Sequence, residues 1–347
     1  MIETNYKDLF NIEKEILDEI DPELFSFLEF WKSNKKEIDV KTSGSTGIPK
    51  KIKISKEQMV ASANATINHF NLKKNCTILC CLPLKYIGGK MIIVRGLILK
   101  ARILIIKPKA IPFKMINNEI DLLAITPLQL YNLSKQPQSF SNIKLTLIGG
   151  GKISEQVIEE IQSLPNQFFQ SYGMTETVSH IAVRNLKNYF KNPNYQCLNG
   201  NTIDLGKNGQ IIIKSDYLNI KSITTNDIGL KTDYQSFIIK GRKGFIINSG
   251  GLKIDSNNIK SELKKTLNSE LFFIDKIKCN KLGEKMILIA SNKINLLDLK
   301  ISINNIKDKK RRPKEVYIID KFIFNNNQKI DILKTKERAL NSKKINI

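Results

Sequence analysis

Apolar residues in the first half of the chain form short continuous runs separated by segments with helical spacing. The continuous runs occur at 76–82, 101–107, 122–126 and 145–148, and helical spacing is found at 91–99, 128–133 and 154–164. Runs of this length are typical of strands that are buried on both faces, as in a parallel sheet. The alternation of strands and crossover helices predicts a layered α/β fold with mainly parallel sheets.

The pattern changes near residue 240. Strand-like runs at 210–214 and 237–240 are followed by the turn Gly241-Arg242-Lys243-Gly244. Beyond it lie helices near 258–268 and 296–306 and strands at 285–290 and 315–320. We therefore expect a large α/β domain over 1–240 and a small α+β domain over 241–347.

Residues 1–40 also have helical spacing. Ile12, Ile16, Leu17 and Ile20 fall on one face, which predicts an amphipathic N-terminal segment packed on the large domain. Trp31 in this segment could line a ligand pocket, but a role in the core is favoured for a lone tryptophan.

The composition bears on whether the protein binds nucleic acid. The formal net charge is +23, from 56 Lys and Arg against 33 Asp and Glu, but these lysines are spread along the whole chain. A nucleic-acid interface normally gathers its cations on one stripe, so a solvated basic surface is favoured over nucleic-acid binding. The charge would raise the encounter rate with anionic substrates. Both a monomer and a homo-oligomer fit the sequence.

Targeting signals and cysteines indicate the compartment. Residues 1–10 lack the apolar stretch of a signal peptide, and no run approaches the roughly 20 apolar residues of a membrane helix. The five cysteines are odd in number and lack paired CxxC spacing, so we expect reduced thiols and no zinc site. A cytoplasmic protein without membrane insertion is expected.

Residues 41–50 read Lys-Thr-Ser-Gly-Ser-Thr-Gly-Ile-Pro-Lys. Glycines let backbone N–H groups converge, hydroxyls add donors and lysine adds a cation, so the segment is a candidate phosphate cradle. Ile48-Pro49 excludes a Walker A loop, which needs lysine directly after its second glycine. The alternative is a flexible surface loop. The candidate phosphate ligands are Thr42, Ser43, Gly44, Ser45, Thr46, Gly47 and Lys50.

Together with four further segments, this run resembles the motifs of the adenylate-forming acyl-CoA ligase family, in the family's order. Tyr172–Glu176 is similar to its YGxTE motif, and Thr225–Asp227 to its TGD motif with Asn226 in place of glycine. Gly241–Lys243 with Gly250-Gly251 resembles the hinge region and glycine loop. Gln328-Lys329-Ile330-Asp331 resembles the segment with the family's final lysine. The set spans almost the whole chain.

The resemblance implies a reaction in two steps. A carboxylic acid and ATP give an acyl-adenylate and pyrophosphate, and the thiol of coenzyme A then gives a thioester and AMP, with Mg²⁺ as cofactor. In the family the small domain rotates between the steps. Gly244 stands at the position of the family's hinge residue, and a glycine can absorb a large φ/ψ change.

The resemblance also implies residue roles. The phosphate loop would hold the β- and γ-phosphates, Thr175 the α-phosphate and Glu176 the Mg²⁺ ion. Lys329 would stabilise charge on the attacking carboxylate and the α-phosphate. Adenine would lie between Gly149–Gly151 (Gly149, Gly150, Gly151) and Tyr172, and Asp227 with Arg242 would bind the ribose. Gly250 and Gly251 would line the coenzyme A tunnel.

The acid is indicated by two features. The run Tyr172–His180 and the short lead-in of about forty residues before the phosphate loop resemble the branch that activates o-succinylbenzoate for menaquinone synthesis. Leu82–Gly89 resembles the family's LPLxHxxG motif, with Tyr86 in place of histidine. The candidates for the acid pocket are Tyr86, Gly88, Lys90, Arg95 and His180. A second carboxylate needs a cation, for which Lys90 and Arg95 are candidates.

Several alternatives stay open at this point. Arg95 could equally be a cation on a helix surface. The chain could be a ligase for another acyl or aryl acid, a non-catalytic member of the family or, from a different class, a basic nucleic-acid-binding protein. The last lacks an aromatic–basic motif and a helix-turn-helix signature in this sequence.

Overall fold

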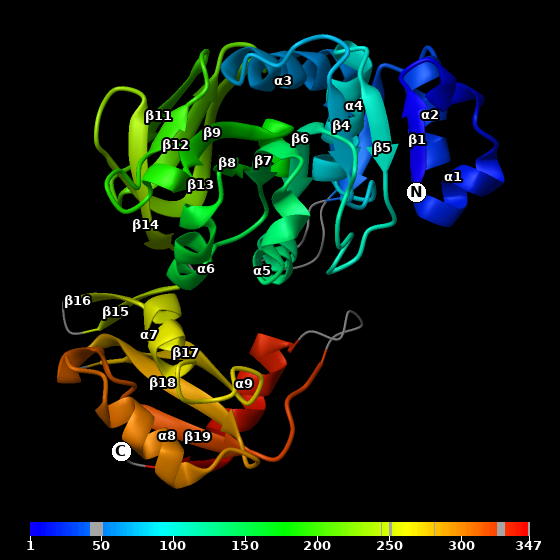
Figure 1. The fold of residues 1–347 in the computed structure, drawn as a ribbon. Helices are drawn as coiled ribbons and strands as arrows, with labels where there is room; N and C mark the ends of the chain where they lie inside the picture. Colours follow the sequence, from blue (N-terminus) through cyan, green and yellow to red (C-terminus); the bar gives the residue numbers. More distant parts are fainter. Residues whose placement is uncertain (42–50, 244, 250–251, 281, 325–329, 346–347) are drawn as a thin grey trace. The chain divides into compact units, whose positions relative to one another are not determined.

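The computed structural model describes residues 1–41, 51–243, 245–249, 252–280, 282–324 and 330–345. The chain divides into two compact units (Figure 1). The larger unit comprises residues 1–206, 212–224 and 230–238, and the smaller unit comprises 207–211, 225–229 and 239–347. The division into a large domain over 1–240 and a small domain over 241–347, each with its own part in the reaction, stays a prediction.

Among the described residues, a twelve-stranded sheet organises the larger unit. Its central strands β5, β4, β6, β7 and β8 are parallel to one another, which confirms the predicted layered α/β fold. β1 adds an antiparallel edge that the sequence pattern did not predict, and β8 pairs antiparallel with β9. The strands in sheet order are β1 (Ile2–Asn5), β5 (Arg102–Ile105), β4 (Thr77–Cys80), β6 (Ile120–Ile125), β7 (Ile143–Ile148), β8 (Gln167–Gly173), β9 (His180–Asn185), β10 (Tyr195–Cys197), β14 (Ser236–Arg242), β13 (Ile220–Lys231), β12 (Gln210–Ser215) and β11 (Asn201–Leu205).

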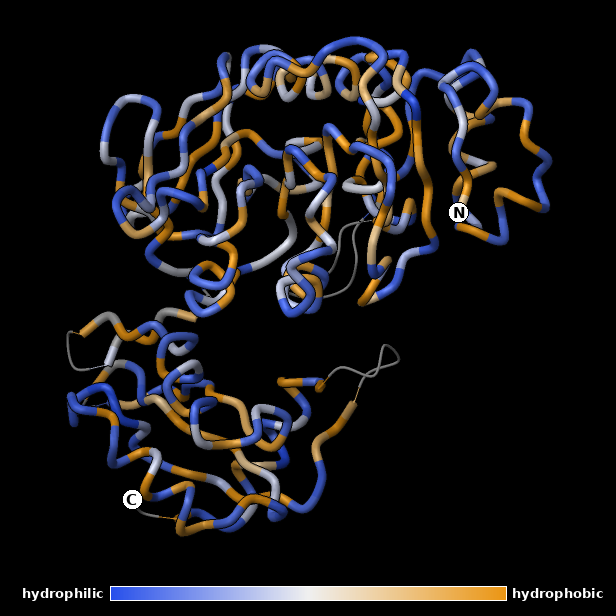
Figure 2. The backbone as a smooth tube through the Cα atoms, in the orientation of Figure 1, coloured by the Kyte–Doolittle hydropathy of each residue, from blue (hydrophilic) through white to orange (hydrophobic). Residues whose placement is uncertain are grey.

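Helices cover both faces of the parallel strands (Figure 1). The first face packs on α3 (Lys56–His69) and α4 (Ile87–Ile98), the second on α5 (Pro127–Ser134) and α6 (Glu155–Glu160). Successive residues of a strand point to opposite faces. Ile78 and Cys80 therefore belong to the first core, while Leu79 and Cys81 belong to the second. Burial on both sides explains the continuous apolar runs, and Figure 2 shows these strands as hydrophobic stretches.

Helix starts follow local sequence signals. Ser55 and Gln58 form a capping box at the start of α3, and Thr126 and Gln129 form another at the start of α5, where Pro127 takes the first helical position. α4 begins at Ile87, earlier than the predicted 91. The 3₁₀ helices are η1 (Asp8–Asn11), η2 (Pro137–Phe140), η3 (Ile161–Ser163), η4 (Thr175–Thr177), η5 (Leu186–Asn188) and η6 (Lys309–Arg311).

The N-terminal segment forms two helices, α1 (Lys14–Ile20) and α2 (Leu24–Lys32). Leu17 is buried in the first core, but the placement of Ile16 on the packed face is wrong, because its side chain is 46% exposed. The ring of Trp31 packs 6.2 Å from that of Phe27, in the core role favoured above. A hairpin of β2 (Glu37–Lys41) and β3 (Lys51–Ser55) follows.

The smaller unit is built on a second, six-stranded sheet of its described residues, ordered β16–β15–β18–β19–β20 with β17 paired to β18. α7 and α8 supply Ile259 and Leu299 to the main apolar cluster, and α9 supplies Ala339 to a second cluster. No helix in the described parts of either unit is long and apolar enough to cross a membrane. The elements are β15 (Ile246–Ser249), β16 (Leu252–Asp255), α7 (Ser256–Leu263), β17 (Phe272–Cys279), β18 (Gly283–Ser291), α8 (Leu296–Asn304), β19 (Glu315–Ile319), α9 (Ile332–Leu340) and β20 (Lys343–Ile345).

Candidate functional site

Part of the predicted site lies outside the described residues. This applies to Thr42, Ser43, Gly44, Ser45, Thr46, Gly47, Lys50, Gly244, Gly250, Gly251 and Lys329. The two strands next to the candidate phosphate loop are described: β2 ends at Lys41 and β3 begins at Lys51, and these two residues are partners in an antiparallel pair.

The glycine run 149–151 follows the carboxyl end of β7, where ligands of such sheets bind. The Gly149 N–H donates to the Ile125 carbonyl at 3.0 Å, which continues the pairing with β6. A Cβ atom on Gly149 would lie 2.9 Å from the Ser171 hydroxyl, and Gly150 has a φ of +89°. Neither position accepts a side chain without strain, so the loop presents bare backbone.

The motif Tyr172–Glu176 crosses from the end of β8 into the short helix η4. The Tyr172 ring is nearly buried and lies 5.2 Å from the ring of Phe237 and 5.8 Å from that of Tyr195. Thr175 and Glu176 follow on η4, both half-buried. Glu176 forms no ion pair with another described residue, and its role as the Mg²⁺ ligand stays a prediction.

A strained turn follows this motif. Val178 has φ +62° and ψ −49°, and the Ser179 N–H donates to the Thr177 carbonyl at 2.6 Å. A β-branched residue at positive φ is a genuine outlier and is retained only when its surroundings enforce it. The Thr177 hydroxyl, 2.7 Å from the Ser179 carbonyl, braces the turn. The result is that the Ser179 side chain reaches α4.

Arg95 on α4 meets that side chain. Its Nη2 donates to Ser179 Oγ at 2.8 Å, the residue is 2% exposed, and its Nε has no hydrogen-bond partner. Burial lowers the pKa of Arg95 to about 10, so the guanidinium is still charged at neutral pH. The alternative that Arg95 is a surface cation is therefore wrong. No carboxylate in the described part of the chain forms an ion pair with it.

His180 lies on the other side of Ser179. Its Nδ1 is 3.2 Å from Ser179 Oγ, and its Nε2 is 3.2 Å from Thr66 Oγ1 on α3. Burial, reinforced by the positive charge of Arg95, holds the pKa of His180 well below its usual value. The imidazole is thus neutral at pH 7. The structure brings the predicted Arg95 and His180 together. It adds Ser179, which lies within the run 172–180 but received no predicted role, and Thr66, which no motif contains.

Lys90 has a different environment from Arg95. Its ammonium donates to the Leu84 carbonyl at 2.6 Å and lies 5.1 Å above the ring of Phe27 on α2. Asp21 accepts from the Leu84 N–H at 2.9 Å. The N–H and the carbonyl of Leu84 are therefore each bonded to a buried charged side chain. The contacts seen for Lys90 are structural, and its predicted contact with the acid stays untested.

The remaining acid-pocket candidates lie at the start of α4. Tyr86 precedes the first turn and is 39% exposed, and Gly88 is also exposed. Gly89 is buried: a Cβ atom there would lie 2.5 Å from the Pro83 carbonyl oxygen. The close approach of α4 to Leu82–Pro83 therefore requires glycine at 89.

The candidate ribose residues belong to the smaller unit. Asp227 lies within β13, where its N–H donates to Thr225 Oγ1 at 3.1 Å, so it is a strand residue. Arg242 is the last residue of β14. No cluster of three or more His, Cys, Asp or Glu side chains suited to a metal occurs among the described residues. A carboxylate that binds Mg²⁺ together with phosphate oxygens needs no such cluster.

Residues 42–203 match the family described as AMP-binding enzyme. The match covers somewhat less than half of the chain, and the chain has the fold of adenylate-forming enzymes. Among curated relatives, 2-succinylbenzoate–CoA ligase of Listeria monocytogenes (serotype 4b) is 24% identical over 93% of this chain and 74% of that protein. The enzyme of the same name from Lactococcus lactis is 26% identical over 91% and 77%.

Solved structures give the same picture of the fold. An acyl-CoA synthetase (AMP-forming)/AMP-acid ligase II-like protein from Dyadobacter fermentans has a TM-score of 0.63 at 28% identity, covering 97% of this chain and 99% of that one. O-succinylbenzoate coenzyme A synthetase from Bacillus subtilis, in complex with ATP and magnesium, has a TM-score of 0.72 at 18% identity, covering 95% and 82%. Some curated relatives are much longer than their matched part: the chain spans 50% of the Listeria innocua ligase.

Proposed function

We propose that the protein is an AMP-forming acid–thiol ligase that converts o-succinylbenzoate, ATP and coenzyme A into o-succinylbenzoyl-CoA, AMP and pyrophosphate. The family match, the fold, and the names of the curated relatives support this activity. The substrates and the five free cysteines support a cytoplasmic location.

The observation that carries the choice of acid is the buried, charged Arg95. Burying a guanidinium without a counter-ion is costly, and its Nε donor is unpaired. A dicarboxylic acid supplies what is missing, because one carboxylate reacts while the second accepts from Arg95. A fatty acid or benzoate has no second anion. Ser179 bonds to the guanidinium, and the neutral His180 on the other side of Ser179 adds no charge.

The other residues would then act as the family resemblance implies. Gly149–Gly151 and Tyr172 would enclose adenine, and Thr175 would contact the α-phosphate. Glu176 would hold Mg²⁺, which neutralises phosphate charge when bound. Lys329 would stabilise the charge that develops as the acid oxygen attacks the α-phosphorus.

The test is thioester formation with o-succinylbenzoate, ATP, Mg²⁺ and coenzyme A, with benzoate and a fatty acid as control acids. We expect o-succinylbenzoate to be preferred. Arg95→Met should raise its KM by about 10- to 100-fold, the equivalent of a charged hydrogen bond, and should leave the KM of benzoate almost unchanged. Arg102→Met is the matched control, since Arg102 is exposed and pairs with Glu3. Equal loss for both acids, or a preference for a monocarboxylic acid, would refute the proposed substrate.

A further inference from the structure

The buried side-chain amide of Gln170 contacts the glycine run 149–151. Gln170 on β8 is 3% exposed, and its Nε2 donates to the Gly151 carbonyl at 2.8 Å. Its Oε1 accepts from Nε and Nη2 of Arg184 on β9, at 3.0 and 2.6 Å. Since a guanidinium can only donate, the amide oxygen must face Arg184 and the amide NH₂ must face Gly151. The orientation of Gln170 is therefore fixed.

Arg184 itself is held between two aromatic rings. Its guanidinium lies 4.7 Å from the ring centre of Tyr189 and 4.7 Å from that of Tyr195. The Tyr195 ring stacks on Phe237 at 5.5 Å and lies 5.8 Å from the ring of Tyr172. Arg184 thus reaches Gly151 through Gln170, and Tyr172 through Tyr195.

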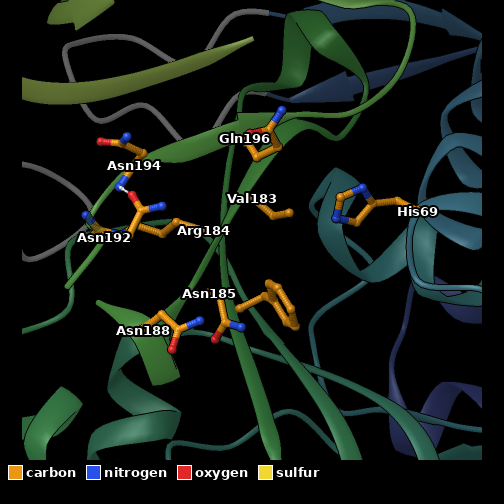
Figure 3. Close-up of a pocket in the computed structure, with 9 residues that line it drawn as sticks. His69, Val183, Arg184, Asn185, Asn188, Asn192, Asn194 and Gln196 are labelled. Atoms are coloured by element: carbon orange, nitrogen blue, oxygen red, sulfur yellow. Dashed lines mark hydrogen bonds between the residues drawn. The ribbon is translucent and has the colours of Figure 1, made fainter. Parts of the chain in front are cut away.

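Arg184 is also one of the residues that line a pocket of about 260 Å³ (Figure 3). The pocket wall is rich in uncharged amides, among them Asn185, Asn188 and Gln196, and has no acidic side chain. No described carboxylate forms an ion pair with Arg184. The position of its charge is therefore set by the two tyrosine rings and by Gln170, which makes these contacts specific to arginine.

We propose that Arg184 and Gln170 are positioning residues for ATP, because they fix the two walls between which adenine would stack. This inference rests on the proposed function, which places adenine between Gly149–Gly151 and Tyr172. The glycine run has no side chains with which to pack, and Gly150 is in the left-handed region. The bond from Gln170 to the Gly151 carbonyl is the side-chain contact that anchors this run, so its loss should let the wall shift away from the base.

Two variants test the proposal, and the binding of ATP with Mg²⁺ is measured by calorimetry. Arg184→Met should raise the dissociation constant of ATP about tenfold, or about 1.4 kcal/mol, while the KM of the acid at saturating ATP changes less than twofold. Gln170→Glu keeps an acceptor for Arg184 but replaces the N–H donor facing Gly151 with an oxygen. It should weaken ATP binding similarly, and because the new ion pair with Arg184 offsets part of the stability lost at the Gly151 carbonyl, the melting temperature should fall less than in Arg184→Met. Arg102→Met serves as the control.

The outcomes separate this inference from the proposed function. If the unaltered protein binds no ATP, both are wrong. If it binds ATP and Gln170→Glu binds equally well, the positioning role is refuted while the ligase activity stands. An equal rise in the KM of ATP and of the acid would also refute it, because that result indicates general loosening of the larger unit. Should Arg184→Met fail to fold, Gln170→Glu decides.

Discussion

Lys90→Met should destabilise the larger unit, although methionine has a similar length and suits an apolar site. Lys90 is 3% exposed, and its ammonium donates to the Leu84 carbonyl and lies over the Phe27 ring. The substitution removes both contacts at once. It also leaves Asp21, which accepts from the Leu84 N–H, without its nearby positive charge.

The size of the effect follows from these contacts. A buried carbonyl left without a donor costs about 1–3 kcal/mol, and a desolvated cation over an aromatic ring contributes about 0.5–2 kcal/mol. Methionine recovers part of this, because burying an ammonium is itself unfavourable. We therefore expect a loss of about 3 kcal/mol in the free energy of unfolding at pH 7.

Urea unfolding followed by the fluorescence of Trp31 measures this loss. Trp31 is the single tryptophan of the chain and packs on Phe27, so its signal reports on the packing around Lys90. Lys73→Met is the matched control, since Lys73 is exposed and bonds only to Asn71 among the described residues, and it should change stability by less than about 0.5 kcal/mol. A loss below 1 kcal/mol for Lys90→Met, with a raised KM for dicarboxylic acids only, would refute the structural role and favour direct contact with the acid.

Two further predictions concern other parts of the chain. Gly89→Ala should destabilise the protein by about 1–3 kcal/mol or more, because its Cβ atom would meet the Pro83 backbone. In Gly88→Ala the added Cβ atom would meet only the Leu82 side chain, at 3.7 Å, so this control should be neutral or slightly stabilising. Thermal unfolding of the two variants distinguishes these results. In the smaller unit, burial would raise the pKa of Glu315, but bonds from two lysines and a tyrosine outweigh this and lower it to about 2. The stabilisation is present above about pH 4.5 and is lost as the pH falls towards 2. Glu315→Gln should cost about 2 kcal/mol at pH 7, and that difference should vanish near pH 2 in denaturant unfolding. A difference that is independent of pH would contradict this reasoning.

The parallel core was predictable because its signal is local. Each of the strands β4, β6 and β7 is a continuous apolar run, and burial on both faces is the usual reason for such a run. Two other strands, β1 and β13, were not predictable in the same way. β1 is short and pairs through backbone groups with β5, and Asp227 lies in a long strand whose polar sequence has no strand pattern. Ile16 follows the helical period, but the period does not show how wide the contact face is.

The residues of the candidate site likewise divide into those that the sequence predicts and those that only the tertiary structure reveals. The motifs marked Arg95 and His180 because of their positions relative to known family segments. They gave no role to Ser179, although it lies in the run 172–180, or to Gln170, since a serine or glutamine in a strand or turn has no distinctive spacing. Their roles arise from tertiary contacts: Ser179 bridges a cation and a neutral imidazole, and Gln170 bridges a glycine loop and an arginine.

The charge balance of the buried cluster connects these points to substrate choice. If His180 were protonated, the cluster around Ser179 would hold two positive charges, which repel each other strongly in a buried site. Burial and Arg95 keep His180 neutral, so the net charge is +1. A single carboxylate neutralises that charge, whereas an uncharged group leaves it unpaired. Under the proposed function, selection for an acid with one additional carboxylate would therefore depend on the neutral His180 as much as on the charged Arg95.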